Sequence, residues 1–240
     1  MIQNNLLAAL SETGRQDLGS HLTKVSVSLG EVLHQAHEEI QYVYFPENCV
    51  ISILSTMEDG STVEVGVVGH EGMVGLRVLL GVKKTPHCAV VQVAGSAMRM
   101  RADQLDQDLR GVGSALRPLL LRYTQALLSQ VSQSAACISQ HSIRQRLARW
   151  LLAMRDRTGS NSLELTHEII SLMLGIRRAS ASENLRELQD AGLIATRRGG
   201  IRIVDSQGLA NTACECYRIV KEEYDQLYSV ESVGNEGARK

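Results

Sequence analysis

The chain has 240 residues, a formal net charge of -1, 44% hydrophobic residues and 21% charged residues. This length is long for one domain and comfortable for two, and the composition is that of a globular protein with a real core. No stretch approaches the roughly 18 consecutive apolar residues that span a bilayer, and the polar N-terminal segment lacks the layout of a secretory signal. We therefore expect two folded domains, a cytoplasmic location and no membrane partner.

The cysteines are few, scattered and odd in number: Cys49, Cys88, Cys137, Cys214 and Cys216. This arrangement fits neither a disulfide framework nor the paired CxxC spacing of a structural zinc site. We expect reduced thiols and no metal site. Cys214 and Cys216 are candidates for a redox pair, although residues two positions apart point to different faces of a helix.

The net charge conceals an asymmetry along the chain. Residues 142–204 contain eleven arginines and no lysine against six acidic residues, a net charge of +5, so the remainder carries -6. A positive module on an acidic body favours a localised surface that binds a polyanion. The alternative is that these arginines only solvate helix surfaces.

The first half of the chain has the pattern of β structure from Val25 to about Ala102. Hydrophobic residues alternate with polar or small ones in short runs, and Asp59-Gly60 supplies the positive-φ residues of a tight hairpin between two runs. Many short strands separated by glycines predict a barrel or jelly roll. The alternating positions are Tyr42, Tyr44, Ile51, Ile53, Val63, Val65 and Val67.

After Gly113 the hydrophobic spacing changes to steps of three and four, which predicts a helix of about 25 residues and about 37 Å. Pro118 is tolerated because it lies in the first turn. The helix could lie wholly against its own β domain, but we favour pairing of much of it with the same helix of a second copy. The apolar stripe consists of Leu116, Leu120, Tyr123, Leu127, Val131, Ser134 and Ile138.

Helix signals continue in the last third of the chain. Ser142 and Gln145 form a capping box at the start of a helix that stops near Gly159. Thr166 then caps a short helix that ends at a turn containing Gly175. These signals predict two helices before the most basic part of the segment.

A third helix is predicted from about Arg177 to Ala191, ended by Gly192, and a basic hairpin follows around the turn residues 197–200. Two helices joined by a short glycine turn, the second beginning with arginines, match a helix-turn-helix whose second helix enters the DNA major groove. The hairpin would be a wing that contacts phosphates. A winged-helix fold used for protein contacts is the alternative.

The chain also resembles the Crp/Fnr family of bacterial regulators over nearly its whole length. Four stretches carry the resemblance, namely Leu29–Leu33, Val67–Met73, the helix before Ser142, and Leu165–Val204. The segment Cys214–Arg218 is similar to the ending of a divergent branch of that family.

The resemblance implies an α+β fold with an N-terminal cyclic-nucleotide-binding-type β-roll (jelly roll), a long dimerisation helix and a C-terminal winged helix-turn-helix. We place the β-roll in residues 1–112 and the dimerisation helix in 113–140. The Crp-type winged helix-turn-helix DNA-binding domain then occupies 141–208, and a C-terminal helix and tail occupy 209–240.

Family members that sense cyclic AMP hold its ribose with a Gly-Glu segment and its phosphate with a following Arg-Ser pair. Glu71 fits the first role, but His87-Cys88 stands where the arginine should be, so a buried phosphate would lack its bidentate partner. The resemblance therefore implies a pocket that is degenerate or that takes a small effector other than cyclic AMP. Its expected residues are Gly69, Glu71, Gly72, His87 and Cys88.

Other cofactors of the family find little support in the sequence. The iron–sulfur branch needs a cysteine cluster near the N-terminus, and no cysteine precedes Cys49. His34 and His37 with His70 or His87 could bind a metal or haem, but lone histidines in a β-roll are more often surface or core residues. We expect no resident cofactor.

The base-reading triplet usual in the family is arginine, glutamate and arginine, and it falls on Arg178, Ala179 and Glu183. Only the first is retained, so the resemblance implies an operator that differs from the best-known family site. Residues at phosphate-contacting positions fix register rather than sequence. The expected DNA-binding residues are Thr166, Arg177, Arg178, Ser180, Ser182, Glu183, Arg197 and Arg198.

Together these features predict a homodimeric, sequence-specific transcriptional regulator that binds double-stranded DNA at a two-fold symmetric operator and alters recruitment of RNA polymerase. Its β-roll would sense an effector and orient the recognition helices. The alternative function is a ligand-sensing signalling protein without a promoter role. We expect no enzyme, because the sequence has no P-loop, HExxH or GxSxG motif.

Overall fold

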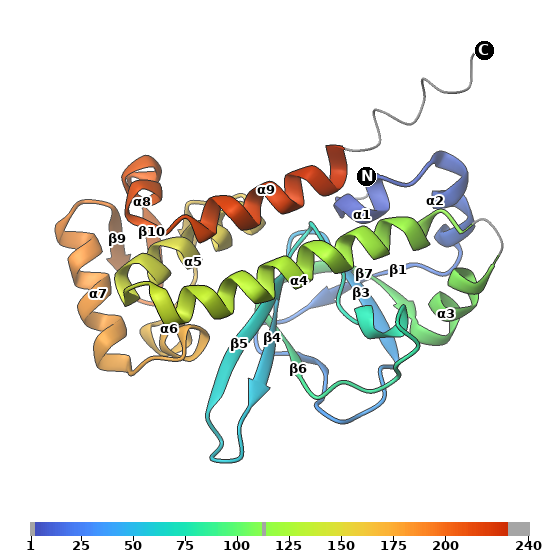
Figure 1. Cartoon of the computed structure of the whole chain (residues 1–240), viewed down its shortest axis with the longest axis horizontal. Helices are drawn as coiled ribbons and strands as arrows, with labels where there is room; N and C mark the ends of the chain where they lie inside the picture. Colours follow the sequence, from blue (N-terminus) through green and yellow to red (C-terminus); the bar gives the residue numbers. More distant parts are fainter. Residues whose placement is uncertain (1–2, 112–113, 230–240) are drawn as a thin grey trace, which may run out of the picture.

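The computed structural model describes residues 3–111 and 114–229. A β domain occupies the N-terminal part, a long helix crosses the molecule, and a mainly helical domain follows (Figure 1). The mixed α and β architecture and the order of its parts confirm the predicted fold class.

The β domain consists of two antiparallel sheets with hydrophobic residues packed between them. One sheet has the strand order β1-β7-β3 and the other the order β2-β6-β4-β5. Val27, Ile51 and Ala97 belong to the core cluster that both sheets share. The strands are β1 (Thr23–Val27), β2 (Val32–His34), β3 (Tyr42–Pro46), β4 (Val50–Thr56), β5 (Thr62–Val68), β6 (Cys88–Val93) and β7 (Gly95–Arg101). The short helices are α1 (Asn5–Ala8), α2 (Glu12–Gly19), η1 (Leu76–Val78) and α3 (Ala102–Arg110).

The predicted hairpin between β4 and β5 is confirmed, but of its two expected positive-φ residues only Gly60 has a positive φ, and Asp59 does not. Gly60 has a φ of 82°, and the side chain of Asp59 accepts a hydrogen bond from the Ser61 amide at 2.9 Å. An Asx-type bond with a glycine in the left-handed region closes such a turn without strain. The hairpin projects β4 and β5 beside the C-terminal domain (Figure 1).

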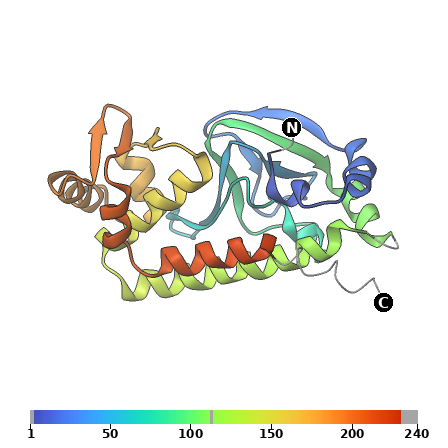
Figure 2. The same cartoon turned by 90° about the horizontal axis from the view of Figure 1, so that it is seen from above.

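The long helix α4 (Leu116–Gln140) has the predicted length of 25 residues, and the C-terminal helix α9 (Cys216–Ser229) runs antiparallel beside it. Both lie on one long face of the molecule (Figures 1 and 2). The expected single stripe is divided between two faces: Leu116, Leu120 and Tyr123 are buried against the β domain, whereas Val131 and Ile138 are exposed. The division arises because α9 and the β domain together cover one side of α4.

The helices of the C-terminal domain begin and end close to the predicted residues, which confirms their predicted boundaries. The capping box of Ser142 and Gln145 is present, and Thr166 caps its helix through the Ile169 amide. A two-residue strand joins the predicted hairpin as a third strand, too short to leave a sequence pattern. The elements are α5 (Ile143–Thr158), β8 (Ser162–Leu163), α6 (His167–Leu174), α7 (Arg178–Asp190), β9 (Ile194–Arg197), β10 (Gly200–Ile203) and α8 (Ser206–Thr212).

In residues 3–111 and 114–229, no helix combines the length and apolar character needed to cross a membrane.

Two glycines, one on each side of α7, have positive φ values, and together they test how the turn between α6 and α7 packs. Gly175 has a φ of 61°, and a Cβ there would lie 3.1 Å from Val63 Cγ2, whereas Gly192 has a φ of 72° with open space around it. Gly192→Ala should therefore cost about 1–2 kcal/mol from backbone strain alone, and Gly175→Ala should cost more. Urea unfolding measures both, and equal losses would show that the contact with β5 is irrelevant.

Candidate DNA-binding surface and effector pocket

Helices α6 and α7 form a helix-turn-helix around Gly175. Ala181, Leu185 and Leu188 bury one face of α7 in the core of the C-terminal domain. The buried guanidinium of Arg146 in α5 donates to the Leu174 carbonyl at 2.5 Å. This bond satisfies a carbonyl at the end of α6 that the helix itself leaves unpaired.

The first turn of α7 faces outward. Arg177, Arg178 and Ala179 are exposed, and Glu183 is exposed one turn further along. Arginines beside a helix N-terminus add to the partial positive charge of the unpaired backbone amides there. The arrangement presents a positive helix end that can meet phosphates and base edges.

Three other predicted residues have structural partners within the domain. The Ser182 hydroxyl lies 2.9 Å from His167 Nδ1, which ties α7 to α6. The Ser180 carbonyl accepts from the Asn184 side chain, and the Thr166 hydroxyl accepts from the Ile169 amide at 3.2 Å. Thr166 is nevertheless exposed, whereas the two serines are half-buried.

The basic hairpin is formed by β9 and β10, with Gly199 at a φ of 76° in its turn. We call this hairpin, residues 194–203, the wing. Arg198 is exposed at its turn, whereas Arg197 forms an ion pair of 2.5 Å with Glu164. Both side chains of that pair are largely exposed, so a phosphate can compete for Arg197 at small cost.

The predicted effector residue Glu71 is buried and forms an ion pair with Arg157 of α5. Glu71 Oε1 lies 2.7 Å from Arg157 Nε and also accepts from the Gly69 amide at 3.1 Å. Burial disfavours the charged guanidinium, but Glu71, together with Tyr224 and Glu64, more than offsets this and raises the pKa of Arg157. The carboxylate expected to bind a ligand therefore links the β domain to the C-terminal domain.

The two predicted pocket glycines allow close packing around this ion pair. A Cβ on Gly69 would lie 2.7 Å from Glu71 Oε2, and a Cβ on Gly72 would lie 2.3 Å from the Tyr123 hydroxyl of α4. Neither position can carry a side chain without displacing its neighbours. In this structure Gly69 allows the contact with α5, and Gly72 allows the contact with α4.

A cavity of about 200 Å³ lies between β5, α4, α5 and α9. Glu71 lines it, but Gly69, Gly72, His87 and Cys88 do not. Cys88 instead pairs with Leu54 in the sheet, and His87 lies near Arg77. Further polar side chains around the cavity include Glu64, His70, Gln130, Arg149, Trp150, Asp156, Arg157, Tyr217 and Tyr224.

The sequence analysis did not predict that residues of the C-terminal domain line this cavity. Trp150 Nε1 donates to Glu64 Oε1 at 3.0 Å, and burial raises the pKa of Glu64. Arg157 continues the helical spacing of Trp150 and Met154 on α5. Arg157 thus stands on an otherwise apolar face of the helix. Because a charge is buried only with a partner, this position could have indicated that Arg157 pairs with an acidic residue elsewhere in the chain.

Comparison with known families decides what these two domains are. Residues 24–110 match the model of a cyclic nucleotide-binding domain, and residues 145–212 match a Crp-like helix-turn-helix domain. The chain belongs to the Crp/Fnr family of DNA-binding transcriptional regulators. No curated protein sequence matches it at a significant level.

Solved structures of Crp/Fnr regulators share the fold. FixK2 from Bradyrhizobium japonicum has a TM-score of 0.69 at 18% identity, over 80% of this chain and 98% of that one. A transcriptional regulator of the CRP family from Thermus thermophilus has a TM-score of 0.66 at 21% identity, over 79% and 96%. The c-di-GMP responsive regulator CLP from Xanthomonas campestris has a TM-score of 0.64 at 15% identity, over 80% and 99%.

The ion pair of this Crp/Fnr regulator is testable by unfolding. Glu71→Ala leaves the buried Arg157 charge without its carboxylate and should lower the unfolding free energy by about 3–5 kcal/mol. Adding Arg157→Met removes the unpaired charge and should restore much of the loss. Urea denaturation measures both variants. The exposed pair of Arg218 and Glu222 gives the control, Glu222→Ala, with a loss below about 1 kcal/mol. A loss for Glu71→Ala no larger than the control's would contradict the assigned role.

Proposed function

We propose that this regulator acts as a homodimer that places two α7 helices in successive major grooves of a two-fold symmetric operator. The observation that carries the proposal is the exposed arginine pair, Arg177 and Arg178, at the start of a helix whose opposite face is buried. Helices in this arrangement on a dimer are spaced about one DNA turn, or about 34 Å, apart. Bound in this way, the protein would act in the cytoplasm by altering recruitment of RNA polymerase.

Each predicted DNA-binding residue receives a role from its position. Arg178 pairs with guanine O6 and N7, while Ala179 and Glu183 contribute a different preference from the family's usual triplet. Thr166, Arg177, Ser180 and the wing residues Arg197 and Arg198 contact phosphates and fix the register. Ser182 acts indirectly, because its bond to His167 holds α7 against α6.

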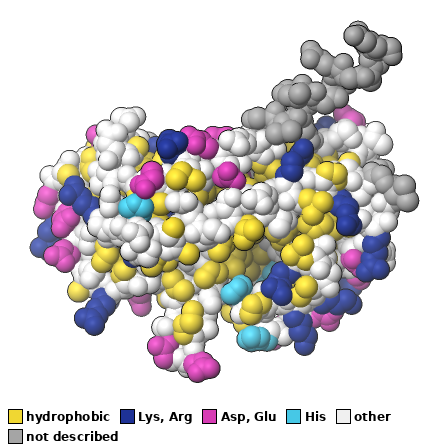
Figure 3. Space-filling view, viewed as in Figure 1, with side chains coloured by type: hydrophobic (Ala, Val, Ile, Leu, Met, Phe, Trp, Pro, Cys, Tyr) yellow, Lys and Arg dark blue, Asp and Glu magenta, His cyan; other side chains and the backbone are white. Residues whose placement is uncertain are grey.

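An exposed apolar seam on α4 supports the dimer. Hydrophobic side chains gather on the face of the molecule that carries α4 (Figure 3). Leu121, Leu128, Val131 and Ile138 are 38% to 58% exposed. With Thr124 and Ala135 they follow the alternating steps of three and four of a heptad repeat, the spacing of a coiled-coil interface. The partner we propose for this seam is the same helix of a second copy.

The cavity between the domains supports effector control. An effector that bound Glu71 or its neighbours would compete with the ion pair to Arg157, and so change how firmly α5 is held to the β domain. Such a ligand shifts the orientation of α7 only by its difference in affinity for the two arrangements. The missing arginine and the occupied Glu71 argue for a small effector other than cyclic AMP.

The role of Arg178 is tested by a gel shift with a duplex selected from random sequence. Arg178→Ala should lose about 1–3 kcal/mol of discrimination at one base position of each half-site. The matched control is Arg110→Ala, an exposed arginine on α3 of the β domain, which removes the same charge far from the helix-turn-helix. Unchanged affinity and sequence preference in Arg178→Ala would reject the assignment of α7. Wild-type affinity that does not fall with salt would instead favour the signalling protein without promoter function.

The dimer is tested by sedimentation velocity. Leu128→Asp places a charge in the centre of the seam and should convert dimers to monomers, because an unpaired charge cannot be buried there without a large desolvation cost. Leu80→Asp is the control, since Leu80 is equally exposed at 58% but lies in the β domain. A Leu128→Asp protein that remains dimeric would exclude this seam as the interface.

A further inference from the structure

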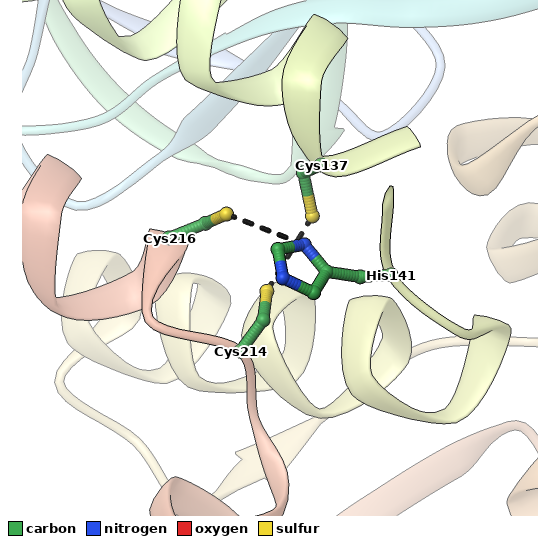
Figure 4. A group of neighbouring side chains, drawn as sticks. All are labelled: Cys137, His141, Cys214 and Cys216. Carbon is green, nitrogen blue, oxygen red and sulfur yellow. Dashed lines mark hydrogen bonds between the residues drawn. The ribbon is translucent and has the colours of Figure 1, made fainter. Parts of the chain in front are cut away.

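Four side chains from distant parts of the chain converge where the C-terminal domain joins α4 and α9 (Figure 4). Cys137 lies in the last turn of α4, and His141 follows the end of that helix. Cys214 lies in the link between α8 and α9, and Cys216 is the first residue of α9. Their ligand atoms all lie within 4.8 Å of one another.

We propose that Cys137, His141, Cys214 and Cys216 bind one zinc ion in a tetrahedral Cys3His site. Zinc–sulfur bonds of about 2.3 Å and zinc–nitrogen bonds of about 2.0–2.1 Å place two sulfurs about 3.8 Å apart and a sulfur and a nitrogen about 3.6 Å apart. The Cys216 Sγ and His141 Nδ1 atoms are 3.6 Å apart, and the Cys137 and Cys214 sulfurs are 3.4 Å apart. Separations of this size fit one ion, whereas an iron–sulfur cluster would hold its ligands further apart.

Two further side chains, Glu215 and Gln133, contact the proposed ligands in the way that groups around a bound metal do. His141 Nε2, the nitrogen that faces away from Cys216, lies 3.2 Å from a carboxylate oxygen of Glu215. A histidine bound to metal through one nitrogen commonly donates through the other to a carboxylate, which fixes its tautomer. The Gln133 side chain also donates to Cys216 Sγ at 3.1 Å.

Charge balance also favours the metal. Binding would form three Zn–S bonds and one Zn–N bond and release the three thiol protons to the buffer, which leaves a net site charge of -1. The positive charges of Arg146 and Arg149 act on Cys137.

Two other roles for the cluster, as part of the hydrophobic core or as a disulfide, explain fewer of its contacts. Three thiols packed as core residues would not require a histidine whose two ring nitrogens face a thiol and a carboxylate. A disulfide between Cys137 and Cys214 would leave Cys216 and His141 without a function. Both alternatives give distinct outcomes in the experiment below.

The position of the site indicates what the metal does. The C-terminal domain begins just after His141 and returns to the long helices just before Cys214. One ion bound to both segments would hold together the start and the end of this domain and fix the domain to α4 and α9. This consequence for DNA binding rests on the proposed function, whereas zinc binding itself does not.

The test measures metal in full-length protein purified under reducing conditions without chelator. Wild type should contain about one zinc per chain, and Cys137→Ser and Cys216→Ser should contain almost none. Cys88→Ser is the matched control, because Cys88 lies in the β domain outside the cluster and should leave zinc content unchanged. Cobalt substituted into wild type should give the visible bands of tetrahedral Co(II) with thiolate charge transfer, and Cys137→Ser should abolish them.

A second measurement covers the case in which the cysteine variants do not fold. Wild-type protein stripped with a chelator should unfold at a lower temperature and recover on addition of Zn2+ but not Mg2+. Glu215→Gln, which keeps all four ligands, should weaken zinc affinity about tenfold in a chelator competition.

Three results would overturn the proposal: wild-type protein free of zinc that cannot take it up, equal zinc in wild type and Cys137→Ser, or a Cys137–Cys214 disulfide in metal-free protein that resists reduction. Arg178→Ala should retain full zinc content, so a failure of the DNA-binding assignment leaves the zinc result interpretable.

Discussion

The relative position of the two domains depends on one buried guanidinium, that of Arg157 at the end of α5. A charge removed from water is tolerated only where each of its donors finds a partner. Arg157 donates to Glu71 of the β domain, to Gln130 of α4 and to the Ala153 carbonyl of its own helix, at 2.7, 3.0 and 3.1 Å. Because Glu71 and Gln130 lie outside α5, a rotation of α5 away from the β domain and α4 leaves the buried charge with only the bond inside its own helix.

This constraint is the physical basis of the proposed effector control. The recognition helix α7 packs on α5, and α5 is held by Arg157 and by the bond from Trp150 to Glu64. In a dimer with a fixed α4 seam, the orientation of α5 in each subunit decides the separation of the two α7 helices. The cavity beside Arg157 is where a small molecule would act on that orientation, since its walls come from the β domain, α4, α5 and α9.

The cysteine and histidine cluster would act on the same domain from its other end. Arg157 holds the C-terminal end of α5, whereas His141 lies just before its N-terminal end. A metal at the cluster would restrict the hinge between α4 and α5 and so reduce the number of orientations that an effector must select. Specific DNA recognition benefits from such restriction, because ordering the domain on binding would otherwise cost conformational entropy.

The sequence alone determined the local structure: the capping box at Ser142, the cap at Thr166, the Asp59-Gly60 hairpin and the helix-turn-helix were all predictable. Each depends on residues a few positions apart, whose side chains and backbone preferences act before the chain is folded. The exposed face of α7 followed in the same way from the spacing of Leu185 and Leu188.

Tertiary structure alone decided the sites. Glu71 and Arg157 are 86 residues apart, and Cys137 and Cys214 are 77 residues apart. The helical argument that separated Cys214 from Cys216 failed because α9 begins only at Cys216, so Cys214 lies in a link that is free to turn its thiol toward the same point. The split of the α4 stripe likewise depends on α9 folding back along it. Contacts between distant segments follow from how the elements pack, and a periodic pattern in one element does not specify its neighbour.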